Sequence, residues 1–173
     1  PESLRHASAF AKYSQETAFG RAQFSLSSYR ATWDPTEQIP ERAIGSAICA
    51  DAFCALDTSA TGKTLRHIGT LRLIGDDWRA TLYSQYYNWN MYSDSTYDFQ
   101  IRQWDKRFIH GARAEKSFSL TDRFELTTGG DGRFDDIHRV QVDHTLQRVF
   151  VDYVAAHKAQ ELSLAGFVEG TWK

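Results

Sequence analysis

The sequence predicts a mainly β protein, a β-sandwich with flanking helices, and three observations carry this prediction. Polar and apolar residues alternate with a period of two in several segments, most clearly in residues 65–73 and 78–86. Turn signals separate these segments, as in the run Gly75-Asp76-Asp77. The 173 residues, 42% of them hydrophobic, suffice for one domain, 1–173, with a sizeable core. A curved-sheet cone or barrel with an N-terminal helix is the alternative architecture.

The first segment of the chain is predicted to be a helix. In residues 2–19, Leu4, Ala7 and Ala11 recur at helical spacing, and Gly20 is a plausible stop. Because this apolar stripe is weak, we expect the helix to stay packed on the sheet and not to permeabilise membranes. The elements that follow are a strand (21–33), a polar loop (34–42), a buried strand or short helix (43–56) and a turn (57–63).

The central stretch is predicted to hold two strands with an aromatic loop between them. Residues 78–86 and 97–102 alternate, whereas residues 87–96 are too aromatic for an ordinary turn and too polar for a core. The later elements are short strands (118–120, 124–126), a glycine-rich break (129–132), a hairpin (137–142 and 149–154, turning near Thr145) and a tail (155–173) with a helical turn and a last strand.

Composition and motifs exclude several classes of function. A net charge of −2, from 22 acidic and 20 basic residues, provides no global field for nucleic acid. The mean hydropathy of −0.51 and the lack of a long apolar run argue against a transmembrane helix. Cys49 and Cys54 form either one local disulfide or two free thiols, and no further soft ligands for zinc lie near them. With no nucleophile motif present, we expect no catalytic residue, no metal and no cofactor, and we lean away from an enzyme.

The candidate site is the aromatic segment together with the cations that follow it. Three of the five tryptophans and five of the eight tyrosines lie within residues 78–109. Rings beside cations suit choline headgroups, sugar faces or the bilayer interface, and basic groups suit a phosphate. The alternative is that the rings are core and the cations are ordinary surface. The cations are Arg102, Lys106, Arg107, Arg113 and Lys116, with His110 among them.

The segment from residue 71 to 104 resembles the central part of actinoporins and of the related fungal fruit-body lectins. In those proteins a strand ends in a serine, and an aromatic loop with an Asn-Trp pair follows. The resemblance implies a β-sandwich that binds membrane headgroups or glycans at this loop. The matching residues are Ser84, Tyr86, Tyr87, Asn88, Trp89 and Tyr92.

Three functional hypotheses follow from the sequence. The first is a non-enzymatic binding module that engages a membrane headgroup or glycan through an aromatic loop at residues 86–92, with Trp89 as the main anchor. The second is a cavity-bearing enzyme or ligand carrier, NTF2-like or calycin-like, with His67 and His138 lining its pocket. The third is a structural subunit that assembles as a homo-oligomer. The ligand-binding residues of the first are Ser84, Tyr86, Tyr87, Trp89, Tyr92 and Arg107.

Overall fold

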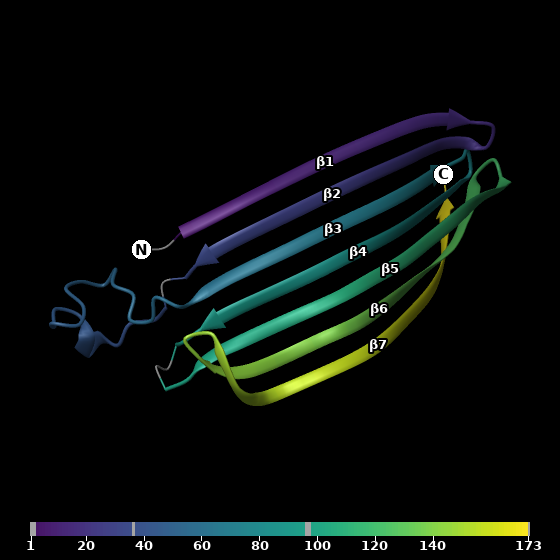
Figure 1. Ribbon diagram of the computed structural model, residues 1–173. Helices are drawn as coiled ribbons and strands as arrows, with labels where there is room; N and C mark the ends of the chain where they lie inside the picture. The colour runs from purple at the N-terminus through teal and green to yellow at the C-terminus, as the bar shows by residue number, and fades with distance from the viewer. Residues whose placement is uncertain (1–2, 36, 96–97, 173) are drawn as a thin grey trace.

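The chain folds into seven long strands that form a single antiparallel sheet (Figure 1). The structure is a computed structural model that describes residues 3–35, 37–95 and 98–172. A short 3-10 helix, η1, spans Glu41–Ala43. The strands are β1 (Ser3–Thr17), β2 (Gly20–Asp34), β3 (Thr61–Ile74), β4 (Trp78–Ser93), β5 (Gln100–Thr121), β6 (Phe124–Leu146) and β7 (Val149–Trp172).

Each strand pairs with its neighbours in the sequence, so the sheet is a simple up-and-down meander. The connections β1–β2, β3–β4 and β5–β6 are tight and all lie at one end of the sheet, which we call the tight-turn end. The opposite end, which we call the loop end, carries the long connection of residues 35–60 (Figure 1). Strands of 14 to 24 residues are much longer than the roughly 3–10 residues usual in globular proteins.

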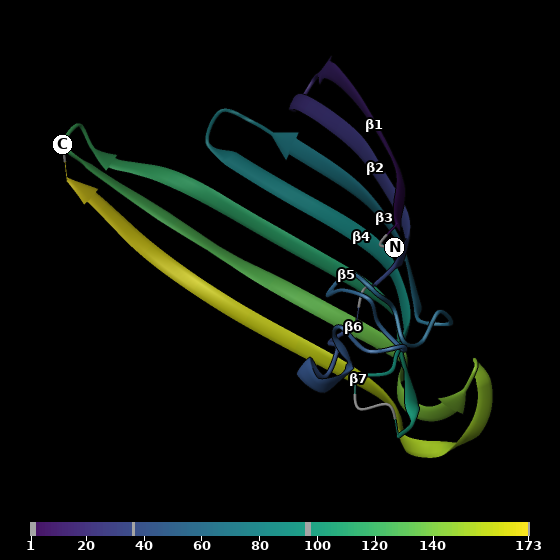
Figure 2. The same ribbon diagram turned by 90° about the vertical axis from the view of Figure 1, so that its left-hand side faces the viewer.

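The sheet is curved and open (Figure 2). Within the described residues, β1 pairs only with β2 and β7 only with β6. Both outer strands therefore present a row of backbone groups with no neighbouring strand.

The prediction of a mainly β fold is confirmed, but the prediction of an N-terminal helix is wrong. Residues 3–17 form β1, and its pairing with β2 runs without a break from Ser3↔Asp34 to Thr17↔Gly20. The alanines fit a helical stripe and also a period of two, and the hydrogen bonds to β2 decide between them. All the described strands belong to one sheet. The described residues therefore contain neither the second layer of a sandwich nor an α-helix that flanks the sheet.

The glycine run 129–132 is not a break but lies inside β6. A side chain at Gly129 would overlap the Phe167 ring of β7, and one at Gly111 of β5 would overlap the Tyr83 ring of β4. These glycines thus make room for aromatic rings on neighbouring strands. The hairpin turn lies at Gln147 and Arg148, two residues beyond the predicted position, and the tail belongs to β7 without a helical turn.

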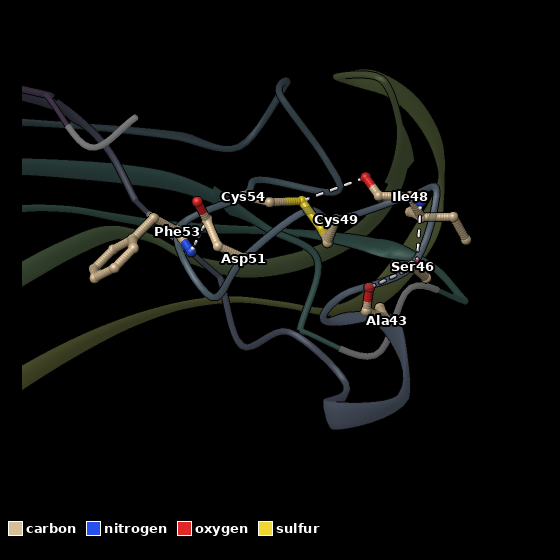
Figure 3. The surroundings of a disulfide bond; sticks show 7 residues. All are labelled: Ala43, Ser46, Ile48, Cys49, Asp51, Phe53 and Cys54. Atoms are coloured by element: carbon tan, nitrogen blue, oxygen red, sulfur yellow. Dashed lines mark hydrogen bonds between the residues drawn. A yellow bond between two sulfur atoms is a disulfide. The ribbon is translucent and has the colours of Figure 1, made fainter.

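The connection of residues 35–60 lies beyond the loop end of the sheet and is closed locally by a disulfide (Figure 3). Cys49 and Cys54 are bonded, with their Cα atoms 5.5 Å apart, which settles the choice between disulfide and thiols. Ser46 Oγ donates to the Ala43 carbonyl at 2.6 Å and accepts from the Ile48 amide at 3.1 Å, which folds the segment before the disulfide (Figure 3). Residues 43–56 are therefore neither a buried strand nor a helix, apart from the end of η1.

The described residues contain no helix with the length and apolar character of a membrane span.

Candidate functional site: the two faces of the sheet

The strand register assigns each side chain to one of two faces. Directly paired residues of antiparallel strands project to the same side, so a row of partners can be followed across the sheet. One row crosses all seven strands and is apolar throughout: Tyr13, Phe24, Leu71, Leu82, Ala112, Gly132 and Leu164. The adjacent row, on the other face, is polar except for one glycine: Lys12, Ser25, Thr70, Tyr83, Gly111, Arg133 and Ser163.

The face that carries Leu71 and Leu82 is here named the apolar face. The rows on either side of the Leu71 row are mostly apolar, with Gln15, Ser84 and His110 as polar members. The three rows together contain no Asp, Glu, Lys or Arg among the described residues. Many of these side chains are open to solvent, such as Leu82 at 49% and Leu164 at 74%. Large exposed apolar surfaces are typical of sites that contact other proteins or membranes. The flanking rows are Ala11, Leu26, Gly69, Ser84, His110, Phe134 and Leu162, and Gln15, Ala22, Leu73, Ala80, Ala114, Gly130 and Gly166.

The opposite side, here named the polar face, carries ion pairs between neighbouring strand positions. Arg133 pairs with Asp135 at 2.9 Å, and Glu115 accepts from both Arg79, at 2.5 Å, and Arg113, at 3.2 Å. Arg107 and Asp105 form a further pair, and Arg21 and Glu16 another. This face of the single-layer sheet therefore presents charged side chains that are suited to contact with water.

In the middle of the sheet, burial identifies the polar face as the concave one, whereas the buried residues of the apolar face, such as Gln141 and Asp143, lie near the loop end. Ile109, Asp135 and Ile137 lie on the polar face and are buried, although no second layer covers them among the described residues. Side chains converge on the inner side of a curved sheet and diverge on the outer side. The apolar face, with Leu26 and Leu82 about half exposed, is accordingly the convex one.

The predicted aromatic loop is part of strand β4, and this corrects its geometry. β4 runs from Trp78 to Ser93 without interruption, so Ser84 does not end a strand. The six predicted site residues are divided between the two faces by the alternation. Ser84, Tyr86 and Tyr92 lie on the apolar face, whereas Tyr87, Trp89 and Arg107 lie on the polar face. The second predicted strand began at Tyr97, which lies outside the described residues; the strand described there, β5, begins at Gln100.

On the polar face, Tyr87 and Trp89 line a shallow hollow of about 370 Å³ with Asp105 and Val140. Arg107 is the register partner of Tyr87 and is paired with Asp105. Trp89 thus projects from β4 beside its register partner Asp105 of β5, and does not project from a loop. The anchor role predicted for Trp89 remains a prediction.

An aromatic row crosses the apolar face on the loop-end side of the apolar rows. The His67 and Tyr86 rings are 6.3 Å apart, Tyr86 and Phe108 are 5.0 Å apart, and Phe108 and His138 are 5.6 Å apart. His138 Nε2 lies 3.1 Å from Asp136 Oδ2, but its side chain is 46% exposed. The two histidines predicted to line a pocket therefore lie on an open surface.

A row of cations lies next to the aromatic row, closer to the loop end. Its members are register partners or one step apart on the apolar face: Arg5, Arg30, Lys63, Lys106 and Arg139. The sequence analysis singled out only Lys106 of these five. A signal was present, because a cation begins the alternating apolar positions in β1, β3 and β5 and ends them in β2, which runs in the opposite direction. In β3, for example, Lys63 precedes Leu65, His67, Gly69, Leu71 and Leu73 at every second residue.

A polar cluster fixes the long connection to the loop end of the sheet. Gln100 Nε2 donates to Asp57 Oδ2 at 2.8 Å and to Ser59 Oγ at 2.5 Å, and Arg148 Nε donates to the Ser59 carbonyl at 2.7 Å. Burial tends to raise the pKa of Asp57, but hydrogen bonds from Ser59 and Gln100 and the charge of Arg148 outweigh it. The net result is a pKa below the usual 3.8.

The chain matches no protein-family model, no curated protein and no solved structure. What the fold and the faces define is a class by architecture: a curved, single-layer antiparallel sheet with one apolar and one polar face. The resemblance of the central segment to actinoporins stays a prediction.

Proposed function

We propose that this sheet lies in a lipid bilayer, with its apolar face against acyl chains and its polar face lining an aqueous interior. The single observation that carries the proposal is the unbroken apolar row from Tyr13 to Leu164 on the exposed, convex side of the sheet. The membrane partner predicted from the sequence is retained. The contact is made by a face of the sheet and not by a loop.

The dimensions of the apolar face support this proposal. From His67, in the aromatic row, to Gly75, beside Trp78, the chain extends about 26 Å at about 3.3 Å per residue, which projects to about 20 Å for a strand tilted by about 40°. That approaches the height of roughly 25 Å of the apolar band on membrane-spanning sheets, in which aromatic residues flank the band on both sides. Here His67, Tyr86 and Phe108 lie towards the loop end, and Trp78, Phe118 and Trp172 lie towards the tight-turn end.

The long strands are also explained by this placement. A strand that crosses a bilayer needs about 9–11 residues for the hydrocarbon core, and every strand here has more. In lipid, each unpaired backbone group costs several kcal/mol, so β1 and β7 must each be paired with a further strand. A second copy of the chain, as in the homo-oligomer hypothesis, is one source of such strands.

The competing arrangement is the sandwich predicted from the sequence, in which a second layer covers the apolar face. The order of side chains along the strands favours lipid over a protein layer. A protein core has no reason to place cations, then aromatic rings, then aliphatic residues in successive rows across a whole sheet. A bilayer has this order from headgroup to interface to hydrocarbon.

Alternating accessibility along β4 tests the proposal. Single cysteines would replace Ala80, Leu82 and Ser84 on the apolar face and Thr81, Tyr83 and Gln85 on the polar face, in a Cys49→Ser/Cys54→Ser background. In phosphatidylcholine vesicles, we expect a water-soluble maleimide to label the cysteines on the polar face. A lipid-soluble spin label on the cysteines of the apolar face should report contact with acyl chains.

The same six variants distinguish the alternatives. If a protein layer covers the apolar face, its three positions will be protected from both reagents, with or without lipid. If both sets react equally with the water-soluble maleimide in the presence of vesicles, the sheet does not enter the bilayer and the proposal is wrong.

A further inference from the structure

We propose that the cation row, consisting of Arg5, Arg30, Lys63, Lys106 and Arg139, binds the phosphates of anionic lipid headgroups at one boundary of the bilayer. This inference rests on the proposed function, because it places the row at the level where the apolar face meets water. It adds the class of lipid that the protein selects and the residues that select it.

The register brings these five residues together from five strands. Arg5 and Lys63 are both partners of Thr32, and Arg30 and Lys106 are linked in the next row through Leu65 and Asn88. Arg139 is the partner of Lys106. Two adjacent rows on one face thus carry cations from β1, β2, β3, β5 and β6. A sheet embedded in a membrane would present such rows to the layer of lipid phosphates.

None of the five cations is in an ion pair among the described residues. Arg5, Arg30 and Lys63 are exposed, whereas Lys106 and Arg139 are half-buried. A hollow of about 360 Å³ lies between Arg5 and Arg30. On the polar face, by contrast, most arginines are paired with a carboxylate. The unpaired charge on the apolar face is therefore available to an external anion.

The carboxylates nearest to the row on the same face are engaged elsewhere. Asp136 contacts His138, and Asp143, which is fully buried, accepts both of its hydrogen bonds from Gln141. Asp34 accepts hydrogen bonds from Ser3 and Thr61, with Arg5 adding only a longer-range attraction. The row consequently keeps a net positive charge.

The aromatic row one step towards the apolar rows fixes the depth of the cations. Tyr86 and Phe108 prefer the headgroup level of a bilayer, so Lys106 and Arg139, immediately beyond them, lie at the phosphates. Near an anionic surface each lysine or arginine strengthens binding about fivefold, and the effect falls off within a Debye length.

The test compares two triple variants with the same change in charge and composition. Arg5→Gln/Arg30→Gln/Lys63→Gln removes three members of the row. Lys12→Gln/Arg66→Gln/Arg72→Gln removes two arginines and one lysine from the polar face of β1 and β3, none of them in an ion pair among the described residues. Each protein is placed in nanodiscs of phosphatidylcholine, with and without an equal amount of phosphatidylglycerol. Lipids retained after release into detergent are then counted by native mass spectrometry.

We expect the wild type and the polar-face variant to retain phosphatidylglycerol in preference to phosphatidylcholine. The row variant should bind phosphatidylglycerol more weakly by a factor on the order of 100 at low salt. Equal loss in both variants, or no preference in the wild type, overturns the inference. If the wild type does not enter nanodiscs of phosphatidylcholine alone, the proposed function itself fails. Far-ultraviolet circular dichroism establishes that both variants are folded.

Discussion

The guanidinium carbon of Arg139 lies 4.0 Å from the centroid of the Trp104 ring, and this contact joins β5 to β6 near the loop end. Arg102 lies over the same ring at 4.1 Å, and Trp104 Nε1 donates to Asn88 Oδ1 at 3.0 Å. Trp104 therefore links β4, β5 and β6 on the apolar face, next to the cation row.

Replacing Trp104 by alanine should cost about 2 kcal/mol of unfolding free energy, less than the roughly 3–5 kcal/mol of a fully buried tryptophan. A double-mutant cycle with Arg139→Gln, measured by urea denaturation, should give a coupling of about 0.5–1 kcal/mol. Arg30→Gln serves as the control, since Arg30 does not contact this ring, and its effect should add to that of Trp104→Ala. A coupling of zero with Arg139 would contradict the prediction.

Gly111→Ala should destabilise the sheet by about 1–3 kcal/mol, because the added Cβ would overlap the Tyr83 ring. Gly69→Ala is the matched control, since Gly69 also lies inside a strand but has no atom within 4 Å of that position. Thermal or urea denaturation measures both variants. Combining Tyr83→Ala with Gly111→Ala should remove most of the penalty from the glycine substitution, and failure to do so would place the clash elsewhere.

Leu71→Arg should impair membrane insertion by about 2–4 kcal/mol, as expected for arginine near the centre of the apolar band. Thr70→Arg is the control, because Thr70 is the next residue of β3 and lies on the polar face. Insertion into phosphatidylcholine vesicles, followed by protease protection, measures the difference. Equal insertion of both variants would argue against lipid at the apolar face.

Removing the Cys49–Cys54 bond by a double change to serine should loosen the connection of residues 35–60 without unfolding the sheet. The disulfide closes a short loop, for which chain entropy predicts a contribution of about 2 kcal/mol. Hydrogen exchange should accelerate in residues 44–54 and stay unchanged in β3 and β4. Faster exchange throughout the sheet would show that the loop stabilises the whole fold.

Acidification should release the same connection through Asp57. Its pKa in the folded protein is below the usual value, so its contribution to stability is fully present above pH ~4 and is lost as the pH falls through the folded-state pKa. Hydrogen exchange at residues 57–60 should therefore accelerate below about pH 4. Asp57→Asn, which keeps an oxygen acceptor for Gln100, should remove this pH dependence, and persistence of the dependence would assign it to another group.

The sequence by itself determined the mainly β character of the chain and the division of side chains within the strands that it predicted. The alternation in residues 65–73 and 78–86 predicted β3 and the first half of β4, and Gly75-Asp76-Asp77 predicted the turn between them. These features are local, because a period of two depends only on neighbouring residues. The same alternation, continued past Tyr86, already separates Tyr86 from Tyr87 and Trp89.

The register between strands was decided only by the tertiary structure. Residues 3–17 satisfy a helical stripe as well as an alternation, and fifteen consecutive pairings with β2 select the strand. Arg5 and Arg139 are far apart in the sequence, and they lie in adjacent rows of one face because the five connections from β1 to β6 and the irregularity between Lys106 and Arg107 set the offsets of the strands. A shift of one residue in any strand would move its cation to the opposite face, so residue types alone could not predict the cation row.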